Sequence, residues 1–270
     1  MMYKQFYSLK ENPFNITSDP FFFFASSRHQ EAFDHLQYGI ESRKGIIVVT
    51  GEIGTGKTTL CRILLNRLND KIKTALILNP SFSDLQLLQL IARDLGIDCT
   101  KGNKLDFVWA ITRFLIDQSS RGNNVAVIID ECQNLNVRQL EQIRLLSNLE
   151  TEKEKLLQII LVGQPELLKK LQDHGLRQLN QRVAVRHHIL PLDKNEVAGY
   201  INHRLKTAQA DPKLEFAPDA VEMIYSYSGG TPRLINILCD RALLAGFVGN
   251  TFSITPDVIR QSAREVLLAV

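Results

Sequence analysis

The sequence predicts an α/β fold in which a doubly wound parallel sheet is followed by a small all-helical domain. Apolar runs of strand length alternate with helical stretches between Ile46 and Leu190, which is typical of a parallel sheet covered on both faces. A glycine-rich loop follows the first of these runs. From Pro191 onward the patterns are helical only. We therefore expect an α/β domain over residues 1–192 and a helical lid domain over residues 193–270.

The composition is that of an ordinary soluble globular chain. Of 270 residues, 44% are hydrophobic and 23% are charged, which excludes disordered and fibrous classes. Apolar runs fall short of the roughly 20 residues that span a bilayer, and Phe21–Phe24 is too short and too far inside for a signal peptide. We therefore expect a cytoplasmic chain without a membrane segment. The net charge of +3 is too small to indicate nucleic-acid binding.

Residues 51–58 read Gly-Glu-Ile-Gly-Thr-Gly-Lys-Thr, a complete phosphate-binding loop (Walker A) of P-loop NTPases between a strand and a helix. Glycines let successive backbone N–H groups point inward, and the helix N-terminus adds positive potential, so the loop can hold the α- and β-phosphates. Lys57 is expected to reach the β/γ oxygens and Thr58 to bind Mg²⁺. The residues expected to bind ATP here are Gly51, Glu52, Ile53, Gly54, Thr55, Gly56, Lys57, Thr58 and Thr59. A plain glycine-rich turn is the alternative.

The apolar run Val125–Ile129 ends in Asp130 and Glu131. Because this run lies two strands beyond the phosphate loop, we expect Asp130 to hold Mg²⁺ through water. Glu131 is expected to orient and deprotonate the water that attacks the γ-phosphate. The alternative is a solvated strand end. The pair predicts a Mg²⁺-dependent ATPase that forms ADP and phosphate.

Three further polar residues are catalytic candidates. Gln164 follows the next strand and is a candidate sensor of the γ-phosphate, unless it belongs to a helix-capping turn. Arg182, and after it Arg177, are candidates for an arginine finger that acts on a neighbouring subunit, a role worth about 10³–10⁵ in rate. Surface arginines that contact nucleic acid or nothing are the alternative there. Arg233 begins a helix of the lid domain and is expected to contact the γ-phosphate when the lid closes.

The six histidines show no metal-ligand pattern. His187 and His188 lack a spaced carboxylate or cysteine partner, and strand alternation sends their side chains to opposite faces. The four cysteines lack CxxC spacing and are expected to be buried small residues in a reducing compartment.

Taken together, these motifs resemble the plan of the AAA+ ATPases. The stretches that sharpen the resemblance are similar to those of the ExeA-type ATPases, the general secretion pathway protein A family. They are residues 3–14, 17–20, 28–32, 36–40, 51–62, 130–135, 163–167 and 230–236. The resemblance covers nearly all of the chain.

The resemblance implies that Pro13 and Phe14 flank the adenine. It implies an ATPase that acts as a nucleotide-dependent assembly switch in secretion or envelope export, at the inner face of the inner membrane. The expected partners are further copies of the chain, in a ring or filament, and a secretion or export protein. Many relatives continue into a transmembrane helix and a periplasmic part, whereas this sequence stops at Val270. Transposition ATPases of the MuB and TniB type share the plan and bind DNA, which makes DNA the less favoured alternative partner.

Overall fold

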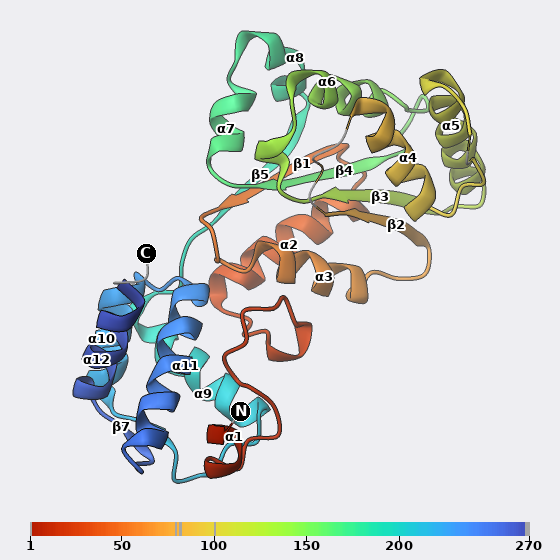
Figure 1. The fold of residues 1–270 in the computed structure, drawn as a ribbon. Helices are drawn as coiled ribbons and strands as arrows, with labels where there is room; N and C mark the ends of the chain where they lie inside the picture. Colours follow the sequence, from red (N-terminus) through yellow and green to blue (C-terminus); the bar gives the residue numbers. More distant parts are fainter. Residues whose placement is uncertain (1, 79, 81–82, 100, 268–270) are drawn as a thin grey trace. The chain divides into compact units, whose positions relative to one another are not determined.

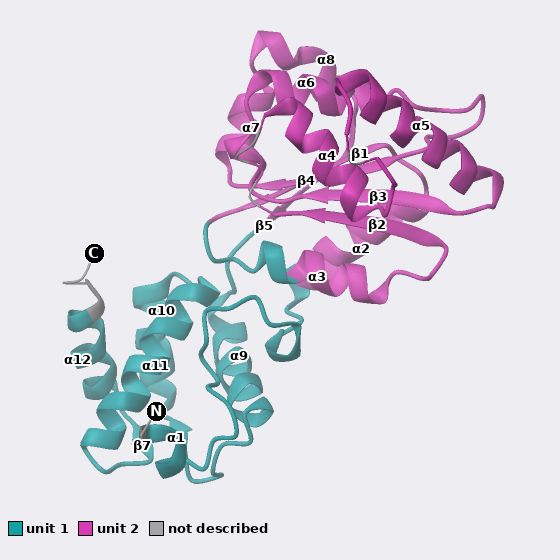
Figure 2. Ribbon diagram, turned by 45° about the vertical axis from the view of Figure 1, so that its right-hand side comes forward, with its two compact units in different colours: residues 1–28, 53–59, 190–270 teal, residues 29–52, 60–189 magenta. Residues whose placement is uncertain are grey.

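The computed structural model describes residues 2–78, 80, 83–99 and 101–267 and divides into two compact units (Figures 1 and 2). We call residues 29–52 and 60–189 the sheet unit, and residues 1–28, 53–59 and 190–270 the helical unit. The chain therefore passes between the units four times, and the phosphate loop is grouped with the helical unit.

The sheet unit is built on five parallel strands in the order β2-β3-β4-β1-β5. The strands are β1 (Ile46–Gly51), β2 (Ile72–Ile77), β3 (Asn124–Ile129), β4 (Gln158–Gly163) and β5 (Val183–Ile189). Every residue of β1, β3 and β4 is buried, as a continuous apolar run predicts for a strand covered on both faces. The two edge strands are only partly buried. The predicted α/β fold is confirmed.

Helices cover both faces of this sheet (Figure 1). One face carries α2 (Ser27–Glu41) and α3 (Lys57–Arg67). The other carries α4 (Asp84–Asp94), α5 (Lys104–Ser120), α6 (Val137–Leu146), α7 (Glu166–Leu171) and α8 (Arg177–Gln181), with short 3₁₀ turns η2 (Cys132–Asn134) and η3 (His174–Leu176). The main core lies on this second face. Capping boxes at Ser83, Asn103 and Asn136 start α4, α5 and α6.

The strand register brings three carboxyl ends to one edge of the sheet. Thr50 of β1 pairs with Gly163 of β4, and Ile129 of β3 pairs with Leu161 of β4. Because parallel strands share one direction, the residues that follow β1, β3 and β4 emerge side by side. This edge is where the predicted catalytic residues of the sheet unit belong.

After Pro191 the described part of the helical unit forms four helices and two very short strands. The elements of this part are α9 (Lys194–Thr207), α10 (Pro218–Ser228), α11 (Pro232–Val248), α12 (Pro256–Leu267), β6 (Glu215–Phe216) and β7 (Ser253–Ile254). The parallel β6–β7 pair was not predicted, because two residues are too short for a periodic pattern. Among the described residues, no helix has both the length and the apolar character needed to cross a bilayer.

The N-terminal segment, with α1 (Met2–Phe6) and η1 (Pro20–Phe22), packs within the helical unit. Its aromatic side chains Tyr3, Tyr7, Phe14 and Phe22 are at most 3% exposed and join the core formed by the C-terminal helices. The sequence pattern alone places this segment in the α/β domain expected over residues 1–192. The structure groups it with residues 190–270 instead, because those aromatic side chains are buried there.

Arg204 of α9 fixes this segment. Its guanidinium donates hydrogen bonds to the carbonyl oxygens of Pro13 and Asn15, the latter at 3.2 Å, and to the Tyr200 hydroxyl at 3.1 Å. The same group lies 5.1 Å from the ring centre of Phe22. Arg204 is 6% exposed, and Pro13 is buried, so the hydrogen bond to the Pro13 carbonyl satisfies polar groups within the core. The Asn236 amide also donates to the Asn15 carbonyl, at 3.3 Å.

Replacing Arg204 with Met should therefore destabilise the helical unit. We expect a loss of about 2–4 kcal/mol in the free energy of unfolding, because the buried Pro13 carbonyl loses this donor and the guanidinium no longer packs on Phe22. Denaturant unfolding measures this, and hydrogen exchange should become faster at residues 9–17. Arg264→Met, at an exposed position of α12, is the control. Equal unfolding midpoints for the two variants would show that Arg204 does not hold the segment.

Candidate functional site

The phosphate loop has the backbone that its sequence predicts. Gly54 and Gly56 adopt left-handed conformations, with φ of +83° and +92°, which glycine alone adopts without a steric cost. The helix α3 begins at Lys57, directly after the loop. Lys57 is only 6% exposed, and Thr55 is fully buried. The loop thus presents a helix N-terminus and a curled backbone, the two features that bind phosphate.

The start of α11 packs directly on this loop. The backbone N–H of Arg233 donates to the Gly54 carbonyl at 3.3 Å. A Cβ atom added at Gly54 would lie 2.5 Å from the Cβ of Arg233 and 3.3 Å from a methyl carbon of Thr231. Gly54 therefore has no room for a side chain. The exposed Arg233 side chain starts beside the phosphate loop, and its contact with a γ-phosphate stays a prediction.

Asp130 and Glu131 follow β3 at the carboxyl edge of the sheet. Asp130 is 2% exposed, and its Oδ1 accepts a hydrogen bond from the Glu131 N–H at 2.8 Å. Glu131 adopts a left-handed backbone with φ of +54°, which costs roughly 1–3 kcal/mol in a residue other than glycine. Such strain is concentrated at functional positions. The left-handed backbone turns the Glu131 side chain in a direction that a residue in extended conformation at the strand end would not have.

Two amide side chains hold the Glu131 carboxylate. Gln133 and Gln164 both donate to its Oε2, the latter at 3.4 Å. The Gln133 oxygen also accepts the Gln164 backbone N–H at 3.1 Å. A Cβ at Gly163 would lie 2.9 Å from that oxygen, so the glycine leaves room for the amide. Lys170 of α7 donates to the carbonyl oxygens of Gln133 and Leu135. The structure therefore brings together Glu131 and Gln164.

Sequence reasoning gave Gln133 no role. Its position two residues after Glu131 was the available signal. Neighbouring Cys132 is fully buried and donates its thiol to the Ile129 carbonyl at 3.0 Å. Burial raises the pKa of this thiol well above its ordinary value, so it is a structural side chain. Cys61 and Cys239 are also buried as predicted, whereas Cys99 is partly exposed.

The arginines predicted to act in trans lie at α8. Arg177 begins this helix, Arg182 follows it, and both side chains are exposed. Arg186 of β5 instead folds back onto Asn180, donating to its carbonyl and side-chain oxygens at 2.9 and 2.7 Å. The finger role of Arg182 or Arg177 stays a prediction.

Pro13 and Phe14 are buried inside the helical unit. Phe14 is 2% exposed and lies 6.2 Å, centre to centre, from the ring of Phe216. Two large apolar side chains of the N-terminal segment face outward, Ile16 at 61% and Phe21 at 66% exposed. A place beside the adenine for Pro13 and Phe14 stays a prediction, and Ile16 is a further candidate that the sequence did not single out.

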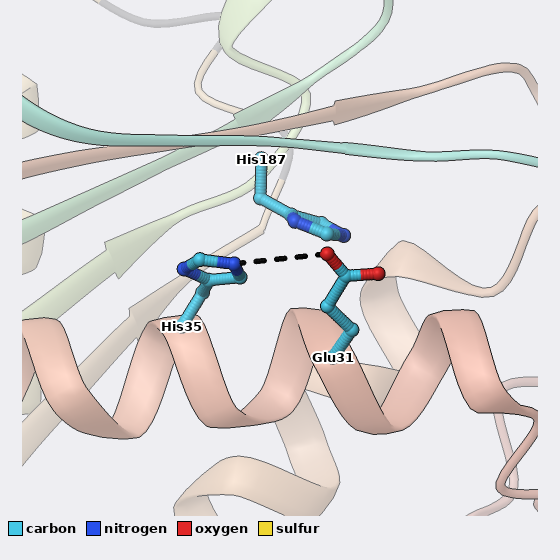
Figure 3. A group of neighbouring side chains, drawn as sticks. All are labelled: Glu31, His35 and His187. Carbon is cyan, nitrogen blue, oxygen red and sulfur yellow. Dashed lines mark ion pairs between the residues drawn. The ribbon is translucent and has the colours of Figure 1, made fainter.

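The structure corrects the expectation that His187 has no carboxylate partner. Glu31 and His35 of α2 lie beside it (Figure 3). Burial, and after it the nearby His35, lower the pKa of His187. His188 contacts a different group, the Thr50 hydroxyl, at 2.9 Å from its Nδ1. Spacing alone could not reveal the cluster, because its histidines come from opposite ends of the sheet unit's sequence.

The chain is similar to known proteins in both sequence and fold. Residues 40–171 match the family described as the AAA domain. The chain is 42% identical over 266 residues to General secretion pathway protein A from Aeromonas hydrophila. That match covers 98% of this chain and 48% of the relative, so the chain spans about half of the relative's length.

Solved structures with similar folds are much more distant in sequence. The Cdc6p protein from Pyrobaculum aerophilum has a TM-score of 0.70 at 19% identity, over 91% of this chain and 70% of its own. The ORC2 protein from Aeropyrum pernix has a TM-score of 0.68 at 17% identity, over 89% and 67%. RuvB from Thermotoga maritima has a TM-score of 0.57 at 19% identity, over 87% and 68%. These likenesses establish the fold.

Replacing Gln133 with Leu tests the arrangement around Glu131. The variant keeps a side chain of similar size and loses both amide hydrogen bonds. If Glu131 is the base predicted from the sequence, kcat for ATP hydrolysis should fall at least about tenfold, because a misdirected base forfeits part of its 10²–10⁴ contribution. Nucleotide affinity should stay unchanged. Gln172→Leu, at an exposed position after α7, is the matched control. A kcat equal to that of the control would rule out positioning by Gln133.

Proposed function

Because the chain belongs to the AAA+ ATPases, of the general secretion pathway protein A type, we propose that it binds ATP with Mg²⁺ and hydrolyses it to ADP and phosphate. The observation that carries the proposal is the position of Glu131. It lies between the amides of Gln133 and Gln164, at the sheet edge where β1 leads into the phosphate loop. A carboxylate held in this way can act as a general base.

In this proposal ATP binds through the loop and the residues after it. The N–H groups of residues 51–59 and the N-terminus of α3 receive the phosphates, and Lys57 pairs with the β/γ oxygens. The Thr58 hydroxyl and the buried Asp130 carboxylate hold Mg²⁺, an ion that prefers such oxygen ligands. When bound, Mg²⁺ neutralises charge that develops on the phosphates.

Hydrolysis depends on the direction of the Glu131 carboxylate. Glu131 orients a water molecule and takes its proton as the γ-phosphate is attacked. Gln133 fixes the carboxylate, while Gln164, which donates to the same carboxylate, would sense the γ-phosphate. The capping of the Gln133 and Leu135 carbonyls by Lys170 keeps the intervening turn in place.

Two arginines couple the nucleotide state to the rest of the protein, Arg233 within the helical unit and Arg182 across to a neighbouring subunit. Arg233 contacts the γ-phosphate, which only ATP carries. ATP therefore stabilises the conformation in which this contact forms, and ADP does not. Arg182 supplies charge to the site of an adjacent copy in a ring or filament. Hydrolysis then releases a secretion or export partner. We place this assembly switch in the cytoplasm, at the inner face of the inner membrane.

Separate substitutions of Lys57 and Glu131 should separate binding from hydrolysis. Lys57→Ala should abolish ATP binding, because it removes the cation that faces the β/γ oxygens. Glu131→Gln should bind ATP normally and lose about 10²–10⁴ in kcat, because it keeps the shape and removes the base. Equilibrium binding of a fluorescent ATP analogue and phosphate release measure the two effects. Equal loss of affinity in both variants would contradict these roles.

Arg233→Ala should weaken ATP far more than ADP. A charge-assisted hydrogen bond of roughly 1.5–3 kcal/mol that is formed only with the γ-phosphate predicts about a 10- to 150-fold selective loss. Titration with each nucleotide measures it. Arg241→Ala, at an exposed position of the same helix, is the control. Equal weakening of both nucleotides would assign Arg233 a structural role at the phosphate loop.

A further inference from the structure

Glu31, His35 and His187 form a compact group of potential metal ligands within the sheet unit (Figure 3). Each offers one ligand atom, and these atoms all lie within 4.8 Å of one another. His35 Nε2 is 3.9 Å from Glu31 Oε1. The two imidazole rings are 5.1 Å apart, centre to centre, and inclined by 32°.

The backbone holds these three side chains together. Gly39 lets α2 approach the sheet closely, since an added Cβ would lie 2.5 Å from Ile47 of β1 and 3.6 Å from Val185 of β5. His35 and Glu31 precede Gly39 at intervals of four, so they share one face of α2. His187 follows Val185 on the same side of β5.

The spacings of the helix and the strand also agree. Four residues of a helix rise about 6 Å and two residues of a strand rise about 6.6 Å. The four residues from Gly39 back to His35 therefore cover nearly the same distance as the two residues from Val185 to His187. This agreement brings His35 opposite His187, and Glu31 follows one turn further along α2.

The ligand set fits a borderline divalent transition metal. Two imidazole nitrogens and one carboxylate oxygen are ligands that Zn²⁺ prefers, and three protein ligands leave a fourth position for water. Ligand atoms about 2.0–2.2 Å from Zn²⁺ lie roughly 3.4 Å from each other in a tetrahedron. The exposed His35 and Glu31 side chains can close the present gaps, which are up to 4.8 Å between ligand atoms, by rotation about their side-chain bonds.

We propose that Glu31, His35 and His187 bind one divalent transition-metal ion, with Zn²⁺ as the preferred ion, and that this ion joins α2 to the edge strand β5. The site is separate from the Mg²⁺ that the proposed ATPase reaction uses. Glu31 lies soon after the chain enters the sheet unit at residues 28/29, and His187 lies just before it leaves at 189/190. The ion therefore links two stretches that lead into the helical unit.

Isothermal titration of the metal-free full chain with Zn²⁺, without nucleotide, tests the proposal. We expect one ion per chain with a Kd of about 1 μM or tighter. His35→Ala and His187→Ala should each weaken binding at least about 100-fold, since even outer-shell partners of metal ligands are worth 10- to 100-fold. Co²⁺ bound in place of Zn²⁺ should give the visible absorption of a tetrahedral site in the wild type and in neither variant.

Controls separate this site from adventitious binding. His174→Ala removes an exposed histidine outside the cluster, and Cys99→Ser removes the partly exposed thiol. Both should leave Zn²⁺ affinity unchanged. The proposal is overturned if Zn²⁺ shows no saturable binding below about 1 mM, if the two cluster variants bind as the wild type does, or if Cys99→Ser abolishes binding. Because nucleotide plays no part, these outcomes do not depend on whether the chain hydrolyses ATP.

Discussion

The parallel pairing of β4 with both β1 and β3 is the constraint on which the arrangement of Glu131, Gln133 and Gln164 depends. It fixes Thr50 opposite Gly163 and Ile129 opposite Leu161, so three segments far apart in the sequence end at one edge. A slip of one residue in either pairing would turn alternate side chains to the other face. The contact between Gln164 and Glu131 exists only because this register is kept.

The phosphate loop belongs to both units along the chain. The phosphate loop leaves β1 of the sheet unit, yet residues 53–59 are grouped with the helical unit. The reason is the close approach of Gly54 to Thr231 and Arg233 at the start of α11. A displacement of the loop is therefore transmitted to α11 by direct backbone contact. Gly54 serves two purposes, because it provides the left-handed turn and the space for that contact.

The features that could be predicted from the sequence are those formed by residues close together in the chain. The phosphate loop, the Asp130–Glu131 pair and the buried strands each occupy a few consecutive residues whose spacing carries the information. Gln133 was missed because its side chain joins two groups, the neighbouring Glu131 carboxylate and the Gln164 backbone N–H, and Gln164 is 31 residues away. The cluster of Glu31, His35 and His187 depends on the packing of α2 against β5, which no periodic pattern reports.

The N-terminal segment shows the same limit. Its aromatic residues predict burial but do not say in which core, and proximity in the sequence suggested the α/β domain. Arg204 donates hydrogen bonds to Pro13 and Asn15, which lie at the other end of the chain. These contacts place the segment in the helical unit. The assignment of domains therefore required long-range contacts, whereas the assignment of fold class did not.

The shared core of the two chain ends determines how the protein can be cut for separate expression. A fragment that ends at residue 192 would keep Tyr3, Tyr7 and Phe14 while losing the helices that bury them. Exposed aromatic surface of this kind promotes aggregation. A fragment that begins at residue 190 would keep those helices but lack the N-terminal aromatic side chains that complete their core. A soluble helical unit would instead need residues 1–28 joined to residues 190–270 by a linker, in either order along the chain.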